Sequence, residues 1–106
     1  MVNNRIQLLL QYLVDDPTDE FSNYALAIEY QAAQQYNKAI TQLENLKLTH
    51  PNYLATYYTL GKLYEQVNNS TEAIINYQIG VVLAKKLNDK KTLSELNEAL
   101  LMLDAL

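Results

Sequence analysis

Apolar residues recur along this chain at three- and four-residue spacing, which is the period of amphipathic helices. The first such stripe predicts a helix over about residues 3 to 14 and comprises Ile6, Leu9, Leu10 and Leu13. Stripes of the same period continue to the end of the chain. They predict about six helices, at residues 3–14, 19–34, 37–49, 52–67 and 71–87 and from about residue 90 onward. With only 2 Gly and 2 Pro among 106 residues, the composition favours an all-α fold class.

Residues near the ends of these helices indicate where each helix begins and ends. Thr18 or Asp19 can cap the second helix, and Ser70 is the expected N-cap of the fifth. Pro51 ends the third helix, because the residue before a proline is pushed out of the α region. The position 34 residues after Pro51 holds Lys85, which does not interrupt a helix. We therefore expect the fifth helix to continue to about residue 87.

The pattern itself repeats after 34 residues. Leu26-Ala27-x2-Tyr30 is followed by Ala39-Ile40, and Leu60-Gly61-x2-Tyr64 is followed by Ala73-Ile74. A partial copy precedes them, since Ile6, Leu9 and Pro17 lie 34 positions before Ile40, Leu43 and Pro51. A period of this length is typical of arrays built from stacked helical units.

The second copy, Tyr57-x2-Leu60-Gly61-x2-Tyr64 followed by Ala73-x3-Tyr77, resembles the tetratricopeptide repeat. The first copy departs from that pattern with Asn23 in place of an aromatic residue, Ala27 in place of Gly and Leu43 in place of the later aromatic. The resemblance implies a single domain, residues 1–106, made of antiparallel helix-turn-helix repeats. Its parts are a partial repeat (1–17), two full repeats (19–52 and 53–87) and a C-terminal capping helix (88–106).

Helix packing explains the residue types in this pattern. Small residues at Gly61 and Ala73 allow the two helices of a repeat to approach closely. Gly80 is explained in the same way. Four aromatic residues at repeat positions are assigned to the core, namely Tyr30, Tyr57, Tyr64 and Tyr77. The last helix carries a stripe of Leu93, Leu96, Leu100 and Leu103 that can cap the stack, with Ser94, Glu95, Asn97 and Glu98 away from it.

Charge and composition exclude several classes of function. A formal net charge of −4 provides no basic field for nucleic acid or an anionic membrane, and mildly favours basic or neutral partners. The absence of Cys excludes disulfides and thiolate chemistry. Gln7 and Gln11 interrupt the first apolar run, so we expect neither a signal sequence nor a membrane span, and a cytoplasmic protein.

No group of residues indicates catalysis, a cofactor or a metal. The single histidine, His50, precedes a proline in a turn without a placed partner for general base chemistry. The acidic pairs Asp15-Asp16 and Asp19-Glu20 lack the alternating ligands of a calcium loop, and helix capping explains them better. We therefore expect a protein that is not an enzyme.

In the resembling family a concave groove is lined by the first helix of each repeat. The corresponding positions here are Phe21, Tyr24, Ile28 and Gln31, then Ala55, Tyr58, Lys62 and Glu65. The Lys and Asn side chains of the family's two-carboxylate clamp are replaced at these positions, and only Lys62 could meet a carboxylate. An apolar, aromatic groove with one cation suits a helix or an extended apolar peptide. Alternatively, these side chains simply cover a neighbouring helix, or the capping helix fills the groove.

The sequence thus predicts a non-enzymatic scaffold that binds a protein or peptide through a concave helical groove. The alternative is a structural module that associates with itself, forming a homodimer through the groove or the leucine-rich C-terminal helix.

Overall fold

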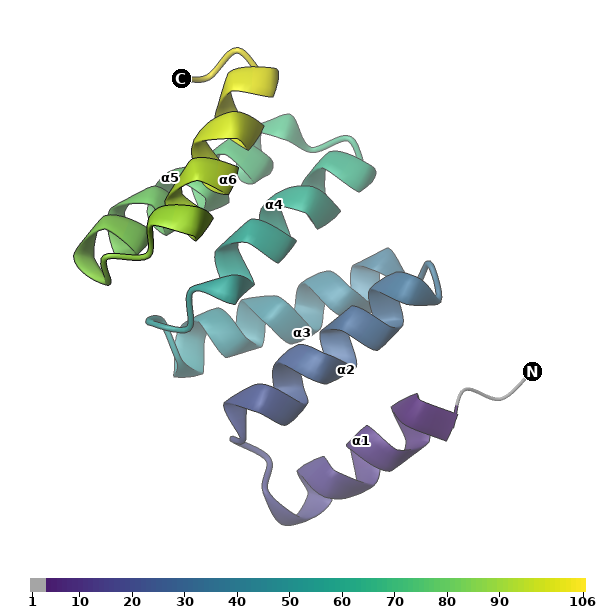
Figure 1. Ribbon diagram of the computed structural model, residues 1–106. Helices are drawn as coiled ribbons and strands as arrows, with labels where there is room; N and C mark the ends of the chain where they lie inside the picture. Colours follow the sequence, from purple (N-terminus) through teal and green to yellow (C-terminus); the bar gives the residue numbers. More distant parts are fainter. Residues whose placement is uncertain (1–3) are drawn as a thin grey trace. The chain divides into compact units, whose positions relative to one another are not determined.

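The computed structural model describes residues 4–106 and confirms the predicted all-α fold with six helices (Figure 1). The predicted start of the first helix at residue 3 lies outside the described residues. The chain forms two compact units, one that ends at Tyr53 and one that spans Leu54–Leu106. The helices are α1 (Asn4–Asp15), α2 (Glu20–Ala32), α3 (Tyr36–Thr49), α4 (Ala55–Gln66), α5 (Ser70–Lys86) and α6 (Lys90–Met102).

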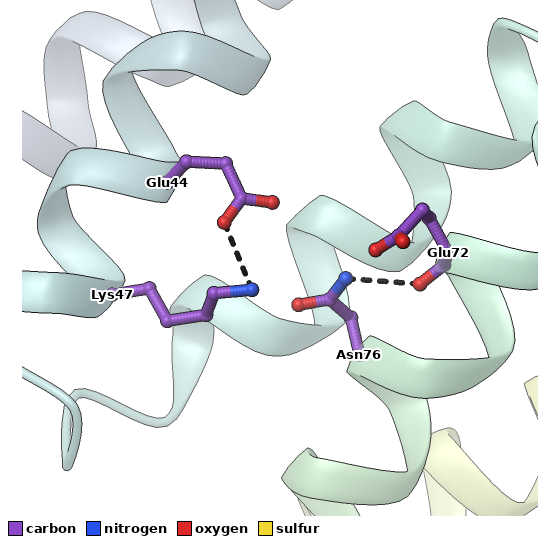
Figure 2. Close-up of polar contacts among 4 residues, drawn as sticks. All are labelled: Glu44, Lys47, Glu72 and Asn76. Atoms are coloured by element: carbon purple, nitrogen blue, oxygen red, sulfur yellow. Dashed lines mark hydrogen bonds and ion pairs between the residues drawn. The ribbon is translucent and has the colours of Figure 1, made fainter.

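In the unit that ends at Tyr53, α2 packs against both α1 and α3. The helix pair α2 and α3 supplies its buried apolar side chains, which are Leu26, Ala27, Ala39, Leu43 and Leu46. Helix α1 has no fully buried residue, and an ion pair of 3.5 Å joins its Arg5 to Glu29 of α2. On α3, the ammonium of Lys47 lies 2.9 Å from the carboxylate of Glu44 one turn earlier (Figure 2).

Asn23, which stands where the repeat pattern has an aromatic residue, joins parts of this unit through hydrogen bonds. Its side-chain nitrogen donates to the backbone carbonyls of Pro17 (3.1 Å) and Asp19 (2.8 Å). Its side-chain oxygen accepts a hydrogen bond from the Gln42 amide of α3. The amide therefore connects the start of α2 to both the preceding turn and the next helix, which an aromatic side chain could not do.

The Leu54–Leu106 unit is built around α5, which packs against α4 and α6. Its core cluster consists of Ala73, Tyr77, Ala84, Leu96, Ala99 and Leu100. The predicted close crossing of α4 and α5 is confirmed, because a Cβ atom at Gly61 would collide with the ring of Tyr77. Gly80 allows α5 to approach both α6 and α4, because a Cβ there would lie 3.0 Å from Leu96 of α6 and 3.2 Å from Tyr57 of α4.

The four tyrosines assigned to the core divide into two classes. Tyr57 and Tyr77 are buried, as predicted. Tyr30 and Tyr64 are only half-buried, so the prediction overstated their burial. Tyr64 packs against the edge of the core cluster, and the Tyr30 ring has the Lys38 ammonium 5.8 Å from its centroid. An amphipathic tyrosine can cover apolar neighbours while one edge stays in water.

Side-chain caps begin three of the helices. Asp19, Asn69 and Asp89 accept hydrogen bonds from the backbone N–H groups of Ser22, Glu72 and Thr92, at 2.8, 3.2 and 3.0 Å. Asp19 was one of the two predicted caps of α2. The prediction of Ser70 as the cap of α5 is wrong, because Asn69 caps that helix and Ser70 is its first residue.

The helix ends also differ from prediction by a few residues. Gln34, Asn68 and Asn88 have φ near +60°, so they end α2, α4 and α5 in the left-handed region. Helix α4 begins at Ala55 rather than at residue 52, after the turn at Pro51. Helix α5 does continue past Lys85 and has 17 residues, against 14 in α3. None of these helices, over residues 4–106, has the length and apolar composition needed to cross a bilayer.

The aspartate caps give the stability of the fold a specific pH dependence. Hydrogen bonds from Ser22 lower the pKa of Asp19, and those from Thr92 lower the pKa of Asp89, relative to the ordinary value of 3.8. Since the folded-state pKa lies below the unfolded one, this stabilisation is complete above pH 3.8 and is lost as the pH falls through the folded-state value.

We therefore expect wild type to lose more stability than Asp19→Ser/Asp89→Ser between about pH 5 and about pH 3, because serine caps without titrating in this range. Urea unfolding at each pH measures the difference. Parallel curves for the two proteins would show that the caps do not contribute to the acid sensitivity.

Candidate functional site

Three of the predicted groove residues, Tyr58, Lys62 and Glu65, lie together on one face of α4. They are spaced by four and three residues, so they follow one another along the helix surface. The ammonium of Lys62 lies 5.4 Å from the ring centroid of Tyr58 and 3.9 Å from the Glu65 carboxylate. The structure therefore joins an aromatic ring, a cation and an anion into one row of contacts.

Helix α6 completes this site with residues that the sequence analysis did not assign to it. Glu95, Glu98, Ala99 and Met102 of α6 surround a cavity of about 180 Å³ together with Tyr58 and Lys62 of α4. Met102 is 79% exposed, and both glutamates are exposed, so these side chains are open to solvent. We call this surface between α4 and α6 the α4–α6 pocket.

Below the pocket, a hydrogen bond joins α5 to α4. The Tyr77 hydroxyl donates to Glu65, and burial raises the pKa of Tyr77 above its usual value. The ring of Tyr77 also lies 6.1 Å from that of Tyr58 and 6.0 Å from the Lys62 ammonium, measured to the ring centroid. Tyr58 and Lys62 are thus supported from beneath by a buried side chain, which limits their movement.

The charges of the α4–α6 pocket do not balance. The ammonium of Lys62 has the Glu65 carboxylate and two aromatic faces around it. Glu95 and Glu98 then add two carboxylates to the rim. The local charge is therefore negative although Lys62 is present, and a cation brought to this rim would gain electrostatic energy.

The other four predicted groove residues lie on α2, in the unit that ends at Tyr53. Phe21 is 69% exposed, whereas Tyr24, Ile28 and Gln31 are half-buried. The Tyr24 ring packs against that of Tyr53, with centroids 5.5 Å apart and planes inclined by 56°. Phe21 is therefore an exposed apolar side chain at the start of α2, and Tyr24 also packs within its own unit.

Another hollow lies over α2 and α3. It has a volume of about 380 Å³ and is lined by Tyr30, Asn37, Lys38, Thr41 and Gln42. Its residues are mostly exposed and polar, and it includes none of the predicted groove residues. We therefore place the candidate site at the α4–α6 pocket, where an aromatic ring, an aliphatic side chain and several charges converge.

The histidine and the acidic residues considered for catalysis or metal binding contact only neighbouring parts of the chain or are exposed. His50 ends α3, and its Nδ1 lies 2.9 Å from the Thr49 hydroxyl. Asp19 caps α2, while Asp15 and Asp16 are exposed at the end of α1. Within residues 4–106, no three His, Asp or Glu side chains gather as a metal site would require.

Comparison with solved structures identifies two similar chains from Salinibacter ruber, both described as a tetratricopeptide repeat domain protein. The crystal structure is 40% identical, with a TM-score of 0.78, over 83% of this chain and 98% of that one. The NMR structure is 41% identical, with a TM-score of 0.77, over 82% and 88%. The crystal structure of MamA is 18% identical and shares the fold, with a TM-score of 0.69 over 92% of this chain and 65% of that one.

Among curated proteins, the chain is 32% identical over 73 residues to anaphase-promoting complex subunit 3 of Dictyostelium discoideum. The match spans 69% of this chain but only 8% of that relative. No protein-family model matches the chain.

Proposed function

Because this chain belongs to the tetratricopeptide repeat family, we propose that it is a non-enzymatic module that binds a peptide or protein segment through the first helices of its repeats. The α4–α6 pocket is the observation that supports this proposal best. It joins Tyr58 and Lys62, at positions that line the groove in this family, to the α6 carboxylates beside them. The match to an anaphase-promoting complex subunit is consistent with a role in protein assembly.

The chemistry of the pocket favours a basic side chain as its occupant. Tyr58 and Met102 offer apolar surface for the aliphatic stem of Lys or Arg, and the ring of Tyr58 can also receive a cation. Glu95 and Glu98 can accept hydrogen bonds from the charged end. A segment with one basic residue among apolar ones would contact both the apolar surface and the carboxylates of the pocket.

The residues of α2 would add apolar contacts of their own. Phe21 is exposed, and Ile28 and Gln31 are half-buried on the same helix. Exposed aromatic side chains are common anchors at interfaces because they bury a large area at a small cost in conformational entropy. We propose that this face of α2 is an apolar contact surface of the unit that ends at Tyr53.

Charge reversal in the pocket tests this function. For an apolar peptide containing one Arg, we expect Glu95→Lys/Glu98→Lys to weaken binding at least about tenfold, since two attractions become repulsions. The same peptide with Glu in place of Arg should bind wild type weakly. Fluorescence anisotropy at physiological salt measures both affinities.

The matched control is Asp15→Lys/Asp16→Lys, which changes the net charge equally at exposed residues of α1. We expect this control to bind the Arg peptide nearly as tightly as wild type. An equal loss in both variants would indicate nonspecific attraction to the acidic chain instead of a site. Failure of the Arg peptide to bind, together with a dimer that Tyr58→Ala dissociates, would favour self-association through the groove.

A further inference from the structure

The outer face of α5 carries a second apolar stripe, separate from the α4–α6 pocket and from the core. Ile75, Ile79 and Val82 are 41%, 40% and 69% exposed. They are spaced by four and three residues, so they form one continuous row along the helix. The buried side of α5 comprises Ala73, Asn76, Tyr77, Gly80, Leu83 and Ala84, and it begins directly beside this row. Helix α5 is therefore apolar on two faces, of which only one is covered.

The repeat architecture does not require this outer stripe. Thirty-four residues earlier, the equivalent positions on α3 hold Thr41, Asn45 and Leu48, all of them exposed. Two of these three side chains are polar, and the same kind of helix folds with them. The isoleucines at 75 and 79 thus have a role that is specific to α5. A contiguous exposed apolar row marks an interaction site, and the same row on a second helix has a matching shape.

The charges at the two ends of the stripe indicate which helix that is. Glu72 and Lys86 continue the row at three- and four-residue spacing, and each lies seven residues from Ile79. Seven residues of helix span about 10 Å. If two copies of α5 crossed antiparallel at Ile79, Glu72 of each copy would face Lys86 of the other. A two-fold axis would form this pair twice, with Ile75 of one copy beside Val82 of the other.

We propose that the chain forms a homodimer through the row Glu72, Ile75, Ile79, Val82 and Lys86 of α5, packed antiparallel on the same row of a second copy. The spacing of three and four residues fits a shallow crossing of about 20°. Ile and Val have few side-chain rotamers to lose on association. A single helix pair is a small interface, so we expect a dimer of micromolar or weaker affinity.

The dimer is measured by sedimentation equilibrium over a range of concentrations, where the molar mass of wild type should rise from 12.2 kDa toward twice that value. The double variant Ile75→Thr/Ile79→Asn gives α5 the residue types that α3 has at the equivalent positions. Since α3 is helical with these residues, α5 should still form. We expect this variant to dimerise at least about tenfold more weakly. Circular dichroism verifies that it is folded.

Charge exchange tests the orientation. Glu72→Lys and Lys86→Glu should each weaken the dimer, by up to about tenfold, because each converts two attractions into repulsions. The double variant Glu72→Lys/Lys86→Glu should recover wild-type association. The matched control is Lys85→Glu, a neighbouring residue outside the row, which should leave the dimer unchanged.

A wild-type chain that stays monomeric up to a millimolar concentration would overturn the proposal. A dimer that withstands Ile75→Thr/Ile79→Asn, or that the double charge exchange does not restore, would also overturn it. These variants lie outside the α4–α6 pocket, so they should bind the Arg peptide as wild type does. Failure of peptide binding and failure of dimerisation are therefore observed separately.

Discussion

Replacing Gly61 with Leu is expected to lower the free energy of unfolding by roughly 3 kcal/mol. The backbone of α4 at this position lies directly against the ring of Tyr77, which is fully buried, and even a Cβ atom would collide with that ring. Tyr77 cannot easily move away, because its hydroxyl donates to Glu65 and its ring belongs to the core cluster. Overpacking must therefore displace α4 or α5.

Urea unfolding of three variants measures this effect. Ala73→Leu should also destabilise, by about 1 to 3 kcal/mol, because Ala73 is fully buried in the same cluster. Gln66→Leu, at an exposed position of α4, should change the unfolding midpoint little. Midpoints near wild type for both Gly61→Leu and Ala73→Leu would contradict the close crossing of α4 and α5.

Removing α6 by truncation after Asn88 is expected to abolish cooperative unfolding of the Leu54–Leu106 unit or to cause aggregation. Leu96, Ala99 and Leu100 would be lost from the core cluster, and the side of α5 that packs on them, including Gly80, would lose its cover. An end unit in a repeat stack needs such a cover because its inner face is apolar. Thermal unfolding followed by circular dichroism, together with light scattering, measures both effects.

The matched control retains α6 and changes only its exposed surface, as in Ser94→Ala. That variant should unfold cooperatively at nearly the wild-type temperature. If the fragment of residues 1–88 were monomeric and unfolded cooperatively, α6 would be a detachable element, and the pocket it forms with α4 would not be a stable site.

Much of this fold could be predicted because the repeat encodes its own packing. Gly61 and Ala73 are small where two helices cross, and the sequence shows them 34 residues after Ala27 and Ala39. The first and last residues of the helices were predicted less accurately, because two neighbouring residues can both be suitable N-caps. Asn69 and Ser70 are both good N-caps, and only the folded backbone selects between them.

The α6 half of the pocket was not predicted because the last helix was assigned only to capping. Helix α6 begins 35 residues after α4, the same interval as between the starts of α2 and α4, so its spacing along the chain is regular. Glu95 and Glu98 were interpreted as residues away from the leucine stripe, with no partner assigned. A signal was nevertheless present, since Glu95, Glu98 and Met102 follow one another at helical spacing. The Asn23 network was also missed, because hydrogen bonds between an amide and distant carbonyls have no sequence period.

The proposed role of the α4–α6 pocket is tested most directly by nuclear magnetic resonance of the ¹⁵N-labelled chain titrated with the Arg peptide. We expect saturable shifts of the amide signals of Tyr58, Lys62, Glu95, Glu98 and Met102, while those of Ile75 and Ile79 on the outer face of α5 stay unchanged at a fixed protein concentration. Saturable shifts confined to α3 or α5, or no saturable shift with any apolar peptide containing a basic residue, would contradict a peptide-binding site between α4 and α6.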